Sequence, residues 1–176
     1  MNRLLIVLMI TLGIVGCSTR ADKIEPAPEK VEQYTYNAVF KNNMWLDPVT
    51  GSYAENAEWS GRIPVESFQE AFTRALTEAN LLSENKSSAD YLISAKLLEI
   101  NKPRVGHHIT ITNKIEYTVT RAKTGEVVMN RVIPATHTTY FGEQLIGVMR
   151  HRLAQEASLG ESIRLFLRDL SLINPR

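Results

Sequence analysis

The 176-residue sequence contains only one cysteine, only 7% aromatic residues and no surplus of charge of either sign. Because Cys17 is alone, neither an intramolecular disulfide nor a cluster of thiolate metal ligands can form. Lysine and arginine total 20 residues against 19 aspartates and glutamates, so the chain has no general positive field to attract nucleic acid. The composition is that of one ordinary globular domain, which excludes global disorder and a polytopic membrane protein.

The sequence also lacks an apolar run long enough to cross a bilayer as a helix, which needs about 20 residues. The longest candidate covers residues 4–15, follows a basic start at Arg3 and ends just before Gly16. A short basic start and a short apolar run are typical of a secretory signal peptide. We therefore predict that residues 1–16 are a signal peptide.

The end of this run, Ile14-Val15-Gly16-Cys17, resembles the lipobox of bacterial lipoproteins. The resemblance implies that Cys17 receives a diacylglyceryl group on sulfur and becomes an acylated N-terminus, held in the membrane by fatty acids such as palmitate. By the same resemblance, Ser18, which is not aspartate, implies sorting to the outer membrane, with the domain on its periplasmic face. The alternative is an ordinary secretory signal with a buried or unimportant thiol.

Residues 17–33 are predicted to be the lipidated cysteine and a flexible tether. Pro26 and Pro28 interrupt any helix, and charges of alternating sign stand among too few apolar side chains to form a core. At about 3 Å per residue, an extended tether lifts the folded part well away from the lipid surface. Residues 34–176 are predicted to form a single periplasmic domain.

Hydrophobic periodicity predicts the elements of this domain. In chain order we predict a strand over residues 34–40, a long loop over 41–62, a helix over 64–82, strands over 91–100, 109–120 and 127–135, and a helix over 142–173. The order β-α-β-β-β-α is typical of an α+β fold with a mainly antiparallel four-stranded sheet and two helices packed on one face.

A few residues define this prediction further. Phe72 lies mid-stripe on the first helix and Ile111 lies mid-face on the strand over residues 109–120, so both are predicted core residues. Asn113 is the only residue that interrupts the apolar face of that strand. Pro134 predicts an edge position or a bulge for the last strand.

Motifs that carry catalysis are missing from the sequence. There is no G-x-S-x-G elbow, H-E-x-x-H pair, Walker loop or G-x-G-x-x-G loop. The histidines do not have the spacing of zinc ligands; they are His107, His108, His137 and His151. We therefore predict no catalytic residue, no metal and no cofactor. An enzyme acting on an acyl or glycan substrate is an alternative, with His137 and Glu156 as the residues to test.

Two groups of side chains are candidates for contacts. Trp45, Tyr53 and Trp59 lie in the predicted long loop, where an aromatic side chain is either packed over the sheet edge or part of an interface. Arg152 and Glu156 are four residues apart on the last predicted helix and form a predicted ion pair. That pair is either solvated or part of a polar cluster that holds the helix to the sheet or to a partner.

Longer segments of the chain resemble a family of small proteobacterial envelope lipoproteins without an established role. The matching segments are Trp59-Ser60-Gly61 leading into residues 68–76, residues 91–103, the strand pair with Gly106 and Tyr117, and residues 147–157. Some relatives bear the name UDP-N-acetylglucosamine acyltransferase, but sugar acyltransferases fold from hexapeptide repeats, which this sequence lacks. The order of elements is more distantly similar to the auxiliary lipoproteins of envelope lipid-transport ABC systems and to small domains of outer-membrane assembly lipoproteins.

Together these features predict a lipid-anchored outer-membrane lipoprotein with a non-enzymatic periplasmic binding or accessory domain. Its expected partners are the membrane, through the lipid groups on Cys17, and another envelope protein or lipid; nucleic acid is not expected. One alternative is an auxiliary subunit of an envelope lipid-transport or export machine. The other is an acyl- or glycan-modifying envelope enzyme.

Overall fold

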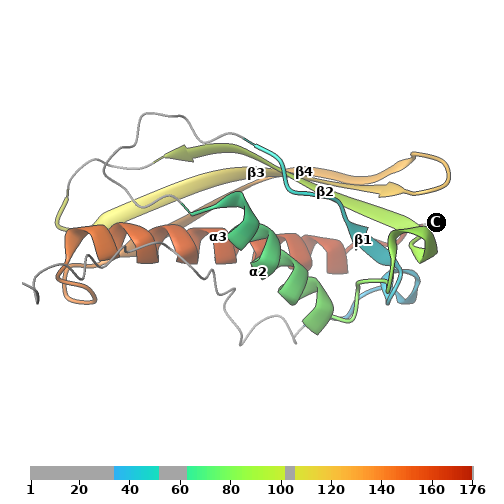
Figure 1. Cartoon of the computed structure of the whole chain (residues 1–176), viewed down its shortest axis with the longest axis horizontal. Coiled ribbons are helices and arrows are strands. Elements are labelled where there is room, and N and C mark those ends of the chain that lie inside the picture. Colours follow the sequence, from blue (N-terminus) through green and yellow to red (C-terminus); the bar gives the residue numbers. More distant parts are fainter. Residues whose placement is uncertain (1–33, 52–62, 102–105, 176) are drawn as a thin grey trace, which may run out of the picture.

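The computed structural model describes residues 34–51, 63–101 and 106–175. Its sheet has the spatial order β1 (Met44–Leu46), β2 (Tyr91–Asn101), β3 (Ile109–Arg121) and β4 (Val127–Thr139). Helices α2 (Val65–Glu78) and α3 (Gly147–Ser171) lie on one face of this sheet (Figure 1). β1 pairs in parallel with β2, whereas β2, β3 and β4 pair antiparallel. The predicted fold class is therefore confirmed, while residues 1–33, with the predicted signal peptide and tether, lie outside the described residues.

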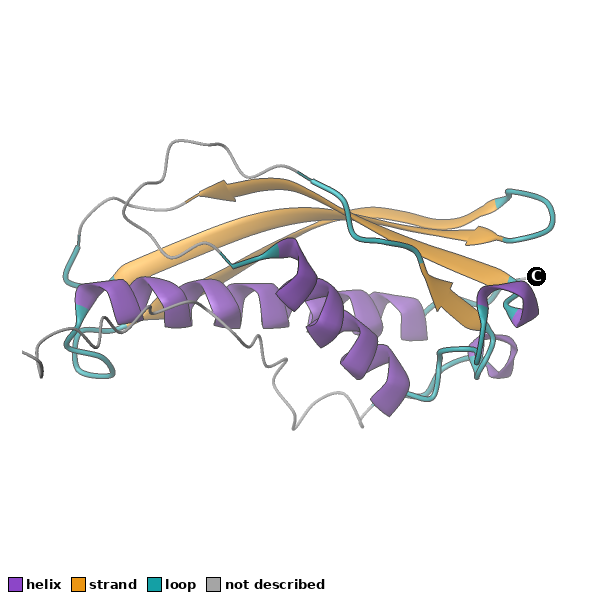
Figure 2. Cartoon of the chain, viewed as in Figure 1, coloured by secondary structure: helices purple, strands orange, loops and turns teal. Residues whose placement is uncertain are grey.

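Strands β2, β3 and β4 form because apolar residues recur at alternate positions and face the helices, most regularly on β3. On β3 the buried side chains are Ile109, Ile111, Asn113, Ile115, Tyr117 and Val119. The opposite face of the sheet carries threonines, and the hydroxyls of the pairs Thr110–Thr138 and Thr112–Thr136 are each 2.8 Å apart. Figure 2 shows this face without a covering helix. The alternation in the sequence thus separates a core face from a polar face.

The main core lies where α2 packs beside the second half of α3 against β2 and β3. Phe72 is fully buried there, with its ring centroid 5.6 Å from that of Tyr117 and 5.1 Å from that of Phe166. The hydroxyl oxygens of Tyr117 and Ser162 are 2.9 Å apart, so the one polar atom of this aromatic cluster is hydrogen-bonded. Ile111 is also fully buried, as predicted, but in a smaller cluster with Ile109 and Ala154.

The first strand lies later in the chain than predicted. Residues 38–40 form a 3-10 helix (Ala38–Phe40), because the side chain of Asn37 accepts a hydrogen bond from the backbone N–H of Val39. The strand is instead β1, inside the segment predicted to be a loop, where Met44 pairs with Tyr91 of β2. Three residues are too few to show a period, and the alternating aromatics before them were the stronger signal.

Three further boundaries differ from the prediction. Helix α2 ends at Glu78 rather than near residue 82, because Asn80 takes a left-handed conformation (φ 54°) and Leu81 N–H donates to the Leu76 carbonyl. Strand β4 continues past Pro134 to Thr139, which an edge strand allows. Helix α3 begins at Gly147 rather than Gly142, and residues 140–146 form a turn instead.

Tyr117 gives the core a predicted dependence on pH. Burial raises the pKa of its hydroxyl above the ordinary 10, although the hydrogen bond with Ser162 acts in the opposite direction. The folded protein therefore holds this proton more tightly than the unfolded chain, so the stabilisation is complete below pH about 10 and is lost as the pH rises further. We expect urea unfolding to show a steep loss of stability above that pH, with a shallower loss in Tyr117→Phe. The stability of the variant will still fall somewhat with pH, because burial also raises the pKa of Tyr36. If stability falls equally steeply with pH in the wild type and in Tyr117→Phe, Tyr117 is not the source of the dependence.

Candidate binding surface

Exposed apolar side chains gather at one end of the molecule, in the turn between β4 and α3 and at the start of α3. We call this surface the apolar tip; it consists of Tyr140, Phe141, Leu145, Ile146 and Val148. Leu145 is 68% exposed and Ile146 is 60% exposed, values that a folded domain rarely leaves to large aliphatic side chains in one cluster. In Figure 1 the turn lies at the left end of α3.

The polar residues of this turn fold back onto its own backbone. Glu143 accepts a hydrogen bond at Oε2 from the backbone N–H of Tyr140, at 2.9 Å. Gln144 accepts one at Oε1 from the backbone N–H of Ile146, at 3.1 Å. The backbone N–H of Glu143 in turn donates to the Tyr140 carbonyl at 3.1 Å. The turn is therefore fixed by its polar groups, and its apolar side chains point outward.

Arg150 joins the turn to α3. Its side chain is buried, and Nη1 donates to the carbonyl oxygens of Gln144 and Leu145 at 2.6 and 2.7 Å. The centre of its guanidinium group lies 5.0 Å from the centroid of the Phe141 ring, a cation–π distance. One buried cation thus holds both the backbone and an aromatic side chain of the tip.

The two adjacent histidines bring a second segment to the tip. The ring centroid of His107 is 5.3 Å from that of Phe141, and the centroid of His108 is 5.1 Å from that of Tyr140. The backbone N–H of Phe141 donates to Nδ1 of His108 at 3.3 Å. The start of β3 and the end of β4 therefore build the tip together.

Behind the tip, polar side chains are buried between the first half of α3 and the sheet. We call them the polar layer; its members are Asn113, Thr139, His151, Gln155 and Ser158. Both side-chain polar atoms of Asn113 and of Gln155 lack a hydrogen-bond partner among the described residues. Buried polar atoms without partners are rare in folded proteins, so this half of α3 is held less firmly than the half over the aromatic core.

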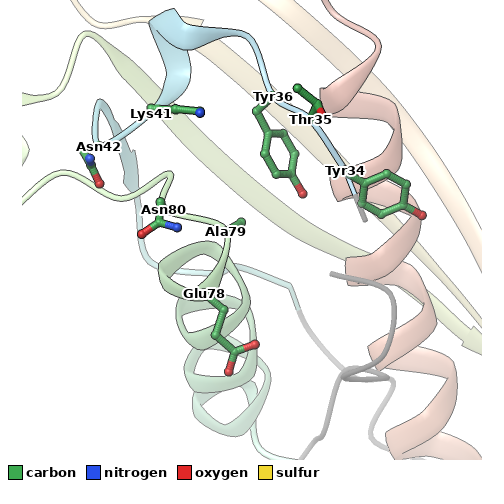
Figure 3. Close-up of a pocket in the computed structure, with 8 residues that line it drawn as sticks. All are labelled: Tyr34, Thr35, Tyr36, Lys41, Asn42, Glu78, Ala79 and Asn80. Carbon is green, nitrogen blue, oxygen red and sulfur yellow. The ribbon is translucent and has the colours of Figure 1, made fainter. Parts of the chain in front are cut away.

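A polar pocket lies away from the tip, between the segment before β1 and the end of α2 (Figure 3). Its volume is about 550 Å³, and it is lined by Tyr34, Thr35, Tyr36, Lys41, Asn42, Glu78, Ala79 and Asn80. Figure 3 shows Lys41 and Glu78 apart from each other in the lining of the pocket. Within the described residues, no group of three or more His, Cys, Asp or Glu side chains is placed to share a metal ion.

The residues singled out from the sequence lie elsewhere. Trp45 is half-buried in β1, on the face of the sheet opposite the helices, beside Leu92 of β2. Tyr53, Trp59 and Cys17 lie outside the described residues, so the aromatic interface stays a prediction. Arg152 Nε donates to Glu156 Oε1 at 2.8 Å. That ion pair is partly buried, with 26% and 16% of the two side chains exposed.

The apolar tip is absent from the sequence prediction because Leu145, Ile146 and Val148 fell within the helix predicted over residues 142–173. Ile146 also fitted near the period of that helix. Two glycines within six residues, Gly142 and Gly147, were the available signal that the chain turns there before the helix begins.

Replacing Arg150 with methionine is expected to loosen the turn. The variant keeps the apolar stem but leaves the carbonyls of Gln144 and Leu145 without their donor, a loss of about 1–3 kcal/mol. We expect hydrogen exchange over residues 141–147 to become about tenfold faster or more. Arg168→Met, which removes a half-exposed arginine from the far end of α3, is the control. Unchanged exchange in the Arg150 variant would show that the carbonyls do not depend on it.

Comparison with known proteins finds solved structures with a similar fold. No family model and no curated protein matches the sequence. A Xanthomonas campestris protein of the DUF330 family has a TM-score of 0.56 at 9% identity, over 76% of this chain and 88% of that one. A hypothetical protein from Chlamydia trachomatis has a TM-score of 0.51 at 13% identity, over 74% and 93%. A minor lipoprotein from Acinetobacter baumannii has a TM-score of 0.44 at 11% identity, over 70% and 89%.

At these identities, the two structures with TM-scores above 0.5 establish the shared α+β fold alone. The described part of the chain contains no helix that is both long enough and apolar enough to span a bilayer.

Proposed function

We propose that the protein is a lipid-anchored lipoprotein of the outer membrane whose periplasmic domain binds another envelope component without catalysing a reaction. The observation that carries the proposal is the position of Cys17, the only cysteine, directly after Gly16 at the end of a short apolar run. Hydrophobic length, small-residue spacing and a solitary cysteine agree in this segment. Two or three acyl chains hold a protein on a membrane far more firmly than one.

The apolar tip supports the binding role. Its aliphatic side chains are exposed although the turn that carries them is fixed by hydrogen bonds that Glu143 and Gln144 accept and Arg150 donates. A rigid exposed apolar cluster is typical of a contact surface. As the auxiliary subunit of a lipid-transport or export machine, the alternative role, the protein would contact a permease or pore protein, which cross-linking in cells would capture.

The ion pair on α3 supports a structural role for Glu156. Its carboxylate accepts a hydrogen bond from Arg152, and His137 lies exposed on the edge strand β4. The enzyme alternative requires these two residues to act on a substrate. Loss of a measurable turnover in Glu156→Gln or His137→Ala, with an unchanged fold, would favour that alternative over the binding module.

Replacing Cys17 with serine tests the anchor. The wild-type protein is expected to incorporate labelled palmitate, to lose residues 1–16 and to require detergent for extraction. In Cys17→Ser the thiol that accepts the lipid is gone, so incorporation and processing are expected to stop. The measurements are palmitate labelling, mass spectrometry and membrane fractionation.

Ser18→Asp is the matched control for this experiment. It keeps the cysteine and is expected to remain lipidated, but to move from the outer to the inner membrane. If Cys17→Ser retains the labelling and processed mass of the wild type, the lipoprotein proposal is wrong. If Ser18→Asp does not move, the assignment to the outer membrane loses its support.

A further inference from the structure

We propose that the apolar tip inserts into the surface of the same bilayer that holds the lipidated Cys17. This inference rests on the proposed anchor and adds a second membrane contact, made by the folded domain itself. The turn joins the end of β4 to the start of α3 and lies at one end of this helix (Figure 1). An exposed apolar turn at the end of a helix is suited to a lipid surface.

The residues of the tip fit the layers of a membrane interface. Leu145 and Ile146 are aliphatic and are the two most exposed residues of the apolar tip. Tyr140 and Phe141 lie beside them, and aromatic side chains favour the level of the lipid headgroups. Glu143 is the only carboxylate of the turn, and its hydrogen bond to the Tyr140 N–H keeps it against the backbone.

Several backbone groups of the turn are already hydrogen-bonded within the protein, which suits an apolar environment in which an unpaired N–H or C=O is costly. The first turn of α3 has no side-chain cap, so its N–H groups face the level of the lipid headgroups. The N–H groups of Tyr140, Phe141 and Ile146 donate to side chains. The carbonyls of Gln144 and Leu145 accept from Arg150. These five backbone groups therefore keep their hydrogen bonds when the turn leaves water.

The chain before the described domain is long enough to allow both contacts. Tyr34 is fixed to α3, because its hydroxyl accepts a hydrogen bond from Arg164 Nη1 at 3.1 Å. From Arg164 to Ile146 the helix path is about 27 Å at 1.5 Å per residue. The residues between Cys17 and Tyr34 reach up to about 50 Å when extended. The anchor and the tip can thus occupy one bilayer at the same time.

The lone cysteine makes the test specific. In the mature lipoprotein the Cys17 sulfur is blocked by lipid, so Leu145→Cys introduces a single free thiol for an environment-sensitive fluorophore. The full lipoprotein is reconstituted in vesicles of phosphatidylethanolamine and phosphatidylglycerol. Ala122→Cys, in the exposed turn between β3 and β4, is the control. Ile146→Cys repeats the measurement at a second exposed position.

At positions 145 and 146 we expect at least twofold quenching by lipids with labelled acyl chains and little quenching by aqueous iodide; at position 122 we expect the reverse. If the protein floats with the vesicles but iodide still quenches the fluorophore at position 145, insertion of the tip is overturned and the lipid anchor is supported. If the fluorophore at position 145 becomes protected from iodide as the protein concentration rises, but is not quenched by labelled acyl chains, a second copy of the protein covers the tip. This outcome also overturns insertion. Protein that does not float overturns the anchor and, with it, this inference.

Discussion

Replacing Phe72 with alanine is expected to lower the free energy of unfolding by about 3–5 kcal/mol, because a fully buried aromatic ring is lost and leaves a cavity. The ring contacts three other aromatic rings, those of Phe68, Tyr117 and Phe166. It therefore joins α2 to β3 and to α3 at one point. Since domains are stable by only about 5–15 kcal/mol, a large share of the total is expected to disappear.

Urea unfolding followed by circular dichroism measures this effect. Leu172→Ala is the matched control, because Leu172 is a large apolar residue that is 78% exposed at the end of α3. Its loss is expected to change the stability by less than about 0.5 kcal/mol. A change at Phe72 as small as that of the control would mean that the domain is held together elsewhere.

Replacing Asn113 with leucine is expected to raise the stability by about 2 kcal/mol. The side chain of Asn113 is fully buried, and neither its amide nitrogen nor its oxygen has a partner among the described residues. Burying an unpaired polar group costs about 1–3 kcal/mol, and leucine has nearly the same shape without that penalty. Ile111 and Ile115 flank the position on the same face of β3, so an apolar side chain completes the row.

Thermal unfolding measures this gain, which corresponds to a rise in Tm of about 4–8 °C for a chain of this size. Thr120→Leu, at a partly exposed position on the opposite face of the same strand, is the control and is expected to be nearly neutral. A fall in Tm of Asn113→Leu would mean that the amide is hydrogen-bonded in solution. The polar layer would then help to hold the first half of α3 instead of weakening it.

The elements with a sustained period were predictable from sequence because burial repeats along them. β3 alternates over its whole length, and α2 repeats its apolar residues every three to four positions. β1 was not predictable in this way, because its three residues form a strand only through pairing with β2. The 3-10 helix before it depends on a cap from Asn37, a local contact that hydrophobic periodicity does not register.

The candidate surface was harder to predict than the fold. The exposure of Leu145 and Ile146 depends on the later start of α3, which in turn depends on hydrogen bonds within the turn. Asn113 was visible as the one break in an apolar face, but the other members of the polar layer come from β4 and α3 and meet it only in three dimensions. Arg152 and Glu156 were the simplest case, because helical spacing alone brings them together.

Strand β4 has a consequence for how the protein avoids aggregation. It is the last strand of the sheet, with 13 residues, and within the described residues its outer edge pairs with no further strand. Such an edge is a template on which another chain can extend the sheet. Pro134 lacks a backbone N–H, so it interrupts the ladder that an added strand would need, and Arg131 places a charge nearby. Pro134 and Arg131 therefore disfavour the edge-to-edge joining of neighbouring copies of the domain.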